Sequence, residues 1–442
     1  MRAAELPKPE RVNQVWLDEA MDQHEAYLRG RPGGQRLSLS FKDARHLDFR
    51  GRELAGLQMV GAELSDTNLA EAILARGSFF GADLSSASLH HSDLTRADLR
   101  GANLSGANLE CADLSEADIR NGFILVRDKH GNLTPMKDGA AELRDVNLAG
   151  ANLTGAMMGR VIGPRTNLTN ANFKNAKLVA ANLSDSDVRG AIFTGADLTD
   201  ADLSGCIFQG AMLGGAILNN TNLDGADLTA AHFQPAELRY AKTRNVRMPK
   251  QIDALDRSVQ EIVADHIRWI DSLGREGNQA DLSCVDLQKV DLSGMNLQAA
   301  VLALANLSYA KLQAGSLTMA NLASVLALQT DFSDCDMRGI KLDCANMAGA
   351  LLRCARLGPI NLVGVVGQRV CASLKEIRLD GADLSGADLE GVDFSKASLC
   401  NVDLRNARIV DAKFIDADLS GADLRGTALD SADMRGATGL RR

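Results

Sequence analysis

A large aliphatic residue stands at every fifth position in the run ADLSSASLHHSDLTRADLRGANLSGANLECADLSEADI, residues 82 to 119. On an α-helix five residues turn by about 140°, so Leu84, Leu89 and Leu94 share no common face. On a β-strand successive side chains alternate, so an odd period sends every second leucine to the opposite side. These leucines can be buried together only if the backbone turns a corner in each pentapeptide and returns above itself. The repeat therefore predicts a solenoid.

The period of five runs through most of the chain in two arrays. The first array covers residues 37–245 and the second covers residues 280–437. The count is interrupted at 120–142 in the first array and changes phase at 363–376 in the second. Because repeats this extensive decide the fold, all other motifs have to be placed within them.

The pentapeptides also share preferred residue types at the two positions before the large residue. A small residue stands two positions before it, and Asp or Asn often stands directly before it, as in Ala82-Asp83-Leu84. This A-[D/N]-L-x-x pattern resembles the pentapeptide-repeat proteins. The resemblance implies an all-β solenoid, a right-handed quadrilateral parallel β-helix with four pentapeptides per coil. It also implies that the large and small residues point inward. With two arrays, we expect two tandem rods with short capping and linking α-helices.

Two segments outside the arrays have apolar residues at helical spacing. They are ERVNQVWLDEAMDQHEAYLRG near the start of the chain and DALDRSVQEIVADHIRWIDSLG between the arrays. The two align without a gap, so that His24 matches His266, and this indicates a tandem duplication of a helix-then-solenoid unit. The end of a solenoid exposes core and unpaired backbone groups, which must be covered. We therefore expect 8–30 to be an N-terminal helical cap and 249–274 a linking and capping helix.

His24 and His266 each stand three residues before an aromatic residue and admit two interpretations. One is a ligand site, and the other is a hydrogen-bonded residue under a cap. We favour the second, because no carboxylate or cysteine accompanies either histidine at the spacing of a metal site. The sequence predicts no metal site and no cofactor site.

The interruption at 120–142, RNGFILVRDKHGNLTPMKDGAAE, predicts a projecting hairpin. An apolar run is followed by a turn signal at His130, Gly131 and Asn132, and the segment is locally basic. One reading is a partner-binding element, since loops held by rigid scaffolds often carry function, and the other is a loop that folds back on the coil. The candidate partner-binding residues in it are Phe123, Ile124, Leu125, Arg127, Lys129 and His130.

Two shorter irregular segments predict local departures from the coil. Residues 159–167, GRVIGPRTN, keep the count of five and predict a small bulge. Residues 363–376, VGVVGQRVCASLKE, shift the phase and predict a hinge in the second rod.

Composition and motifs favour a cytoplasmic binding protein that is not an enzyme. The N-terminal stretch MRAAELPKPERV lacks the apolar core of a signal peptide, and no segment is suited to span a membrane. The eight cysteines form no CxxC pair, and two of them occupy the small inward position. Catalytic motifs such as G-x-S-x-G, H-E-x-x-H or a P-loop do not occur, and the frequent aspartates follow from the repeat.

Two binding functions remain open. The preferred one is a rigid scaffold that presents flat faces and the hairpin to protein partners. The alternative follows from the resemblance, because some pentapeptide-repeat proteins mimic B-form DNA and bind type II topoisomerases such as DNA gyrase, as quinolone-resistance proteins do. Outer aspartates favour the alternative. The candidate residues are Asp383, Asp388, Asp393, Asp403, Asp418 and Asp423, and the first array has a similar series in Asp83, Asp93, Asp98, Asp113 and Asp118.

Charge density weakens the DNA-mimic alternative. A rod of about 80 Å would need on the order of 45 negative charges to imitate DNA, whereas the formal net charge is −9, with 48 Lys+Arg against 57 Asp+Glu. We expect no direct binding of nucleic acid, since the chain is acidic overall, and no membrane binding. Besides protein partners, we expect self-association into a homodimer through the C-terminal coil near Ala428 to Met434, which no further helix follows.

Overall fold

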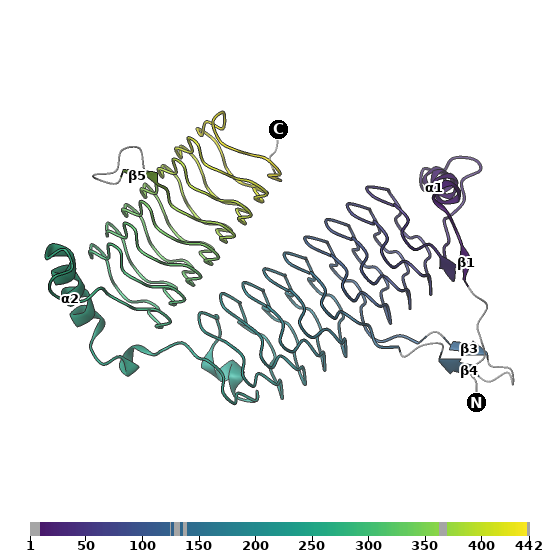
Figure 1. Cartoon of the computed structure of the whole chain (residues 1–442), viewed down its shortest axis with the longest axis horizontal. Coiled ribbons are helices and arrows are strands. Elements are labelled where there is room, and N and C mark those ends of the chain that lie inside the picture. Colours follow the sequence, from purple (N-terminus) through teal and green to yellow (C-terminus); the bar gives the residue numbers. More distant parts are fainter. Residues whose placement is uncertain (1–8, 124, 128–132, 136–138, 362–368, 440–442) are drawn as a thin grey trace. The chain divides into compact units, whose positions relative to one another are not determined.

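The chain folds into two compact units, each containing one array of pentapeptides (Figure 1). Unit 1 comprises Met1–Asp227 and His232–Arg247, and unit 2 comprises Leu228–Ala231 and Met248–Arg442. The computed structural model describes residues 9–123, 125–127, 133–135, 139–361 and 369–439. The regular elements are β1 (Glu10–Arg11), α1 (Gln14–Leu28), β2 (Lys42–Asp43), β3 (Leu125–Arg127), β4 (Leu133–Pro135), the 3-10 turns η1 (Pro235–Leu238) and η2 (Ile252–Ala254), α2 (Val259–Asp271), β5 (Ile360–Asn361) and β6 (Arg369–Val370).

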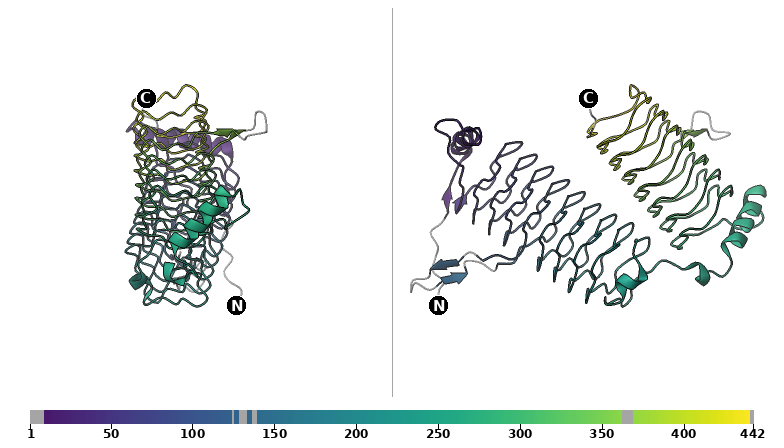
Figure 2. Two further views of the ribbon diagram at one scale, coloured as in Figure 1. Left: turned by 90° about the vertical axis from the view of Figure 1, so that its left-hand side faces the viewer. Right: turned by 180° about the vertical axis from the view of Figure 1, so that it is seen from behind.

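Within each unit the backbone stacks on itself at every fourth pentapeptide, as the coils in Figures 1 and 2 show. Asp83 pairs with Asn103 and Asp98 with Asp118 through parallel bridges, and the same spacing recurs through both units. The bridges are isolated, so each coil is built from four short pairing sites instead of long strands. Each unit is therefore a β-helical solenoid, as the period of five predicts.

The pentapeptide turns its corner at the second residue after the buried leucine. Ser86, His91 and Arg96 occupy successive corners with φ between 57° and 58°, in the left-handed region. A turn hydrogen bond from the Ala87 N–H to the Leu84 carbonyl, 3.1 Å long, closes the corner. The inward leucines and alanines, such as Leu84 and Ala87, are 0–1% exposed and form the core.

Where Asp or Asn stands before the large inward residue, its side chain stabilises the coil. The Oδ1 atom of Asp93 accepts a 2.9 Å hydrogen bond from the Thr95 N–H and so holds the next turn. Asparagines also link successive coils, since the Nδ2 of Asn103 donates to the Oδ1 of Asp83 at 3.0 Å. These side chains therefore have a structural role in the repeat, which explains their frequency without any binding function.

Each array is preceded by a helix that carries one of the matched histidines. In α1 the His24 Nδ1 accepts the Leu37 N–H at 3.0 Å, and in α2 the His266 Nδ1 accepts the Ala280 N–H at 3.0 Å. Both imidazoles are fully buried, and each stacks on the aromatic residue three positions later, with ring centroids 6.0 Å and 5.6 Å apart. The interpretation as hydrogen-bonded residues is confirmed.

Acidification should weaken the junction between each helix and its solenoid. Burial lowers the pKa of His24 and of His266, and the charge of Arg36 acts in the same direction on His24. Because the folded pKa lies below the unfolded value of about 6.5, the unfolded chain binds protons more readily. The free energy of unfolding is therefore highest above that pH and falls as the pH drops through about 6.5 toward the folded pKa.

We expect the melting temperature to fall between about pH 7.5 and about pH 5.5, measured by circular dichroism. A chain carrying both His24→Gln and His266→Gln should show a shallower fall over the same range, because neither side chain titrates. Equal slopes for the two chains would contradict this role of the histidines.

The bulge predicted at 159–167 is wrong. Glu142 pairs with Ile162 and Asn147 with Asn167, both at the regular spacing of the coil. Gly163 takes the place of a core leucine there, and a Cβ atom at this residue would lie 2.8 Å from the Leu143 Cβ. The neighbouring coils already fill the space, so the solenoid continues without distortion.

The hinge predicted at 363–376 is also wrong. Lys341 pairs with Ser373 and Arg356 with Asp388, so the ladder of unit 2 continues across the phase shift. The shift is caused by an antiparallel pair, β5 with β6, inserted at one corner. Residues 362–368 lie outside the described part of the chain.

No helix among the described residues is long and apolar enough to cross a lipid bilayer.

Candidate interaction surfaces

The β3–β4 hairpin is inserted in unit 1 without disturbing its register. Asn103 pairs with Glu142, whereas the regular spacing of the coil would have brought Phe123 to this place. The strands are antiparallel, with Val126 opposite Thr134. Figure 1 shows the hairpin beside the coils instead of within them. The predicted hairpin is therefore present in the backbone.

The base of this hairpin is held closely against the solenoid. The Gly122 N–H donates to the Gly139 carbonyl at 2.7 Å, and a Cβ atom on Gly139 would lie 2.3 Å from the Gly122 carbonyl oxygen. A Cβ atom on Gly122 would lie 2.8 Å from the Phe80 ring, over which the Arg100 guanidinium stacks at 5.1 Å. Glycine at both positions allows this approach, so the hairpin begins from a fixed position.

The residues predicted in the hairpin fall into three groups. The Phe123 side chain is 54% exposed and directly follows Gly122, which lies against Phe80 and Arg100. Leu125 and Arg127 lie in β3, where the backbone alone is described. Ile124, Lys129 and His130 lie outside the described residues.

A second hairpin, β5–β6, was missed by the sequence reasoning. Lys341 pairs with Ser373 where the regular spacing would have placed Asn361, so the added segment leaves the register unchanged. Ile360 lies opposite Val370 and Asn361 opposite Arg369. The available signal was the apolar, glycine-containing stretch that precedes the phase shift, which resembles the sequence of a short hairpin.

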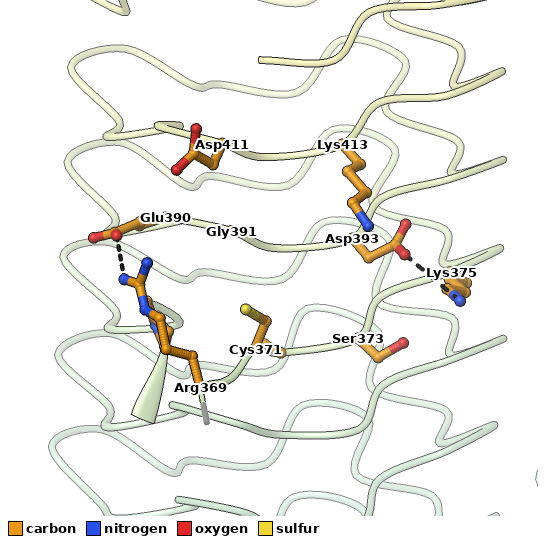
Figure 3. A pocket seen from close by; sticks show the side chains of 11 residues that line it. Arg369, Cys371, Ser373, Lys375, Glu390, Gly391, Asp393, Asp411 and Lys413 are labelled. Carbon is orange, nitrogen blue, oxygen red and sulfur yellow. Dashed lines mark hydrogen bonds and ion pairs between the residues drawn. The ribbon is translucent and has the colours of Figure 1, made fainter. Parts of the chain in front are cut away.

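A shallow cavity of about 330 Å³ lies beside β6 (Figure 3). Its charged lining consists of three cations and three anions: Arg369, Lys375, Lys413, Glu390, Asp393 and Asp411. Arg369 pairs with Glu390 at 2.5 Å and Lys375 pairs with Asp393 at 3.5 Å. Hydrogen bonds from Arg369 and Arg408 lower the pKa of Glu390. Because the charges of the lining balance, the cavity has no marked preference for an anion or a cation.

The six aspartates predicted in the second array do not form one surface. Asp383, Asp403 and Asp423 stack in successive coils. The other three belong to three different ladders, in which Asp388 pairs with Arg408, Asp393 with Lys413, and Asp418 with Ser398. A period of five places consecutive pentapeptides on consecutive faces, so only every fourth aspartate of the series shares a face.

Arginines neutralise the column formed by Asp383, Asp403 and Asp423. Arg405 pairs with Asp403 and Arg425 with Asp423, each at 2.6 Å. The Arg405 guanidinium lowers the pKa of Asp403, and the Arg425 guanidinium lowers the pKa of Asp423 to about 2. Asp383 pairs with Arg353 on the preceding coil. The column is thus an alternation of acids and bases, unlike the uniform charge of a phosphate backbone.

All six aspartates also accept backbone hydrogen bonds. Their Oδ1 atoms accept the N–H of the residue two positions later, at distances between 2.9 and 3.3 Å. They therefore share the turn-holding role of Asp93.

Comparisons with known proteins give the family. A model of pentapeptide repeats matches residues 62–101, 82–121, 141–178, 166–205, 196–234, 206–242, 280–322, 330–366, 370–406 and 407–438. No curated protein gives a significant match to the sequence.

Solved structures of several repeat proteins are similar to this chain. QnrB1, a plasmid-mediated fluoroquinolone resistance protein, is 23% identical over 46% of this chain and 90% of its own, with a TM-score of 0.28. HetL, a pentapeptide repeat protein involved in heterocyst differentiation regulation from Nostoc sp. strain PCC 7120, is 22% identical over 94% of this chain and 98% of its own, with a TM-score of 0.13. A pentapeptide repeat protein of the Arabidopsis thaliana thylakoid lumen is 24% identical over 33% of this chain and 81% of its own, with a TM-score of 0.17. Since the matched segments cover more than half of the sequence, the chain belongs to the pentapeptide-repeat family.

Proposed function

We propose that this protein is a non-enzymatic, rigid scaffold that binds a protein partner through the β3–β4 hairpin. The observation that carries the proposal is an inserted hairpin that leaves the coil register intact. Its base is fixed by close glycine contacts, and Phe123 beside it is 54% exposed. Exposed aromatic side chains on a rigid support are typical of the residues that contribute most to binding.

The scaffold consists, in this proposal, of two tandem right-handed quadrilateral rods, with α1 and α2 as their caps. Four short pairing sites per coil and the family membership support this arrangement. None of the eight cysteines forms a disulfide in the described part of the chain, which is consistent with the reducing cytoplasm, where we place the protein.

The alternative is a DNA mimic that binds a type II topoisomerase such as DNA gyrase. The stacked Asp383, Asp403 and Asp423 are the surface on which it would depend. Pairing of these residues with Arg353, Arg405 and Arg425 argues against it, because arginines cancel the charge that the mimic needs. We therefore prefer the scaffold.

A second copy of the chain is a further proposed partner, at the C-terminal coil. Leu424, Leu429 and Met434 are half-buried there, whereas Leu404 and Ile409 one coil earlier are 0–1% exposed. A coil with partly exposed core residues favours contact with another apolar end. The proposal rests on this contrast.

The scaffold proposal is tested by removing the hairpin and leaving the coil. Deleting residues 122–140 returns Asn103 and Glu142 to the regular spacing of the coil, so the stacked pairing is kept. We expect this chain to melt at the same temperature as the full chain and to lose a partner that the full chain retains from native lysate, identified by mass spectrometry.

The matched control is deletion of residues 360–371 from unit 2, which returns Lys341 and Ser373 to the same regular spacing. This chain should keep the partner. A partner retained after both deletions would refute the hairpin as the binding element and would direct attention to the flat faces. Capture of gyrase or topoisomerase IV subunits would instead support the DNA mimic.

A further inference from the structure

The last coil of unit 1 has a basic surface that is unusual in this acidic chain. Residues 239–247, RYAKTRNVR, contain four basic residues and no acidic one, whereas the whole chain has 48 Lys+Arg and 57 Asp+Glu. Arg239, Lys242, Arg244 and Arg247 are all exposed, and so is Tyr240, at 64%. We call Arg239, Tyr240, Lys242 and Arg244 the basic edge.

The coil geometry brings the basic edge together. Lys242 pairs with Asn222 of the coil before, and the Asn220 N–H donates to the Tyr240 carbonyl at 2.9 Å. Lys242 and Arg244 occupy the two outward positions that flank Thr243, so both extend from the same face. Tyr240 is at the corner that opens this face, and the Arg239 guanidinium stacks over its ring at 5.4 Å.

Arg244 lacks the aspartate partner that several arginines at the same position of the repeat have elsewhere in the chain. In Asp98-Leu99-Arg100 the arginine pairs with the aspartate two residues before it at 2.8 Å, and Arg405 and Arg425 pair in the same way. In the last coil Lys242 takes the place of that aspartate. Arg239, Lys242 and Arg244 make no ion pair with any described residue, so their charges are available to a ligand.

Three exposed cations, two of them arginines, beside an exposed tyrosine are suited to an acidic partner. A single coil is about 5 Å thick, so the complementary surface is narrow. We propose that the basic edge binds a short acidic segment of a protein partner. This site lies on a different coil from the β3–β4 hairpin and does not depend on the function proposed for it.

Nucleic acid fits the basic edge less well. Asp224 lies in the preceding coil, where its Oδ1 accepts the Arg244 N–H at 2.8 Å. Asp200 and Asp202 follow one coil further, linked to Asn220 and Asn222. A phosphate backbone with one charge per about 1.7 Å would extend across these carboxylates and be repelled, whereas a short peptide contacts the last coil alone.

The test uses the full chain and a fluorescein-labelled peptide of ten glutamates, with binding followed by fluorescence anisotropy at low salt. A triple variant, Arg239→Gln, Lys242→Gln and Arg244→Gln, should bind about tenfold more weakly, since three exposed charge pairs are lost. The matched control replaces Arg160, Lys174 and Lys177 by glutamine. These three are exposed and make no ion pair with a described residue, so binding should change less than about twofold.

Tyr240→Ala should weaken binding of the peptide by about threefold without changing the net charge of the protein. Absence of binding by the unaltered chain, or equal losses in the triple variant and its control, would overturn the proposal. A single-stranded oligothymidylate, about as long as the peptide, serves as the second probe, and we expect it to bind more weakly than the peptide. Tighter binding of this oligonucleotide, lost in the triple variant, would replace the acidic peptide by nucleic acid.

Discussion

Leu104→Asp should unfold the middle coils of unit 1 and lower the free energy of unfolding by about 4 kcal/mol or more. Leu104 is 0% exposed in the stack of inward leucines, and its N–H donates to the Glu142 carbonyl of the next coil at 2.8 Å. An aspartate there has no cationic partner, because the inward column contains apolar residues. Either the charge stays buried without compensation or the coil opens to hydrate it.

Urea denaturation followed by circular dichroism gives the free energy, and hydrogen exchange gives its location. Each coil contacts its neighbours alone, so protection should be lost around residues 84–162 and kept in unit 2. The matched control is Leu104→Met, which conserves volume and should cost less than about 1.5 kcal/mol. If the two variants denature at the same urea concentration, position 104 is not in the core.

Asn103, the outward residue directly before Leu104, makes hydrogen bonds that the period of five does not predict. The pattern assigns this residue to the surface, which suggests that another small polar residue would leave the stability unchanged. In the structure its Nδ2 donates to Asp83 and its Oδ1 accepts the Ser105 N–H. Serine at this position would lose the link between coils, at a cost of about 1 kcal/mol.

The solenoid could be predicted because its evidence is periodic. Leucines at every fifth position are incompatible with a helix or a strand, so one geometric argument decides the fold. The same periodicity explains why the prediction that the candidate aspartates form one acidic surface was wrong. Asp383 and Asp388 look like neighbours in one acidic series, but four pentapeptides form a coil, so the two lie on different faces.

The insertions were predictable to different degrees. Residues 120–142 contain an apolar run and a turn signal, and the hairpin followed from them. The β5–β6 hairpin is shorter, and its first core residue after the insertion, Leu374, restarts the count in a new phase. A change of phase does not distinguish a hinge from an insertion, because both interrupt the count. The pairing of Lys341 with Ser373 and of Arg356 with Asp388 across the insertion shows that the coil is unbroken.

Gly163→Leu, which restores the family pattern, should destabilise unit 1 by about 1–3 kcal/mol instead of stabilising it. Sequence reasoning alone would favour leucine here, since every fifth residue around it is large. A Cβ atom at Gly163 would lie 2.8 Å from the Leu143 Cβ and 3.3 Å from the Leu183 Cδ2. The Thr166 hydroxyl also donates to the Gly163 carbonyl at 2.6 Å, and it would lie 3.1 Å from that Cβ.

A second substitution tests whether overpacking causes the loss of stability expected for Gly163→Leu. Leu183→Ala alone should cost about 2–5 kcal/mol by leaving a cavity in the adjacent coil, because Leu183 is 0% exposed. In the chain with both Gly163→Leu and Leu183→Ala, the Leu183 Cδ2 atom that would lie 3.3 Å from the new Cβ is absent and the new side chain can enter the cavity, so the double variant should lose less stability than the sum of the two single changes. Urea denaturation of the four chains gives the coupling. If the two costs are additive, then the leucines of neighbouring coils do not compete for space, and the absence of a leucine at position 163 has another origin.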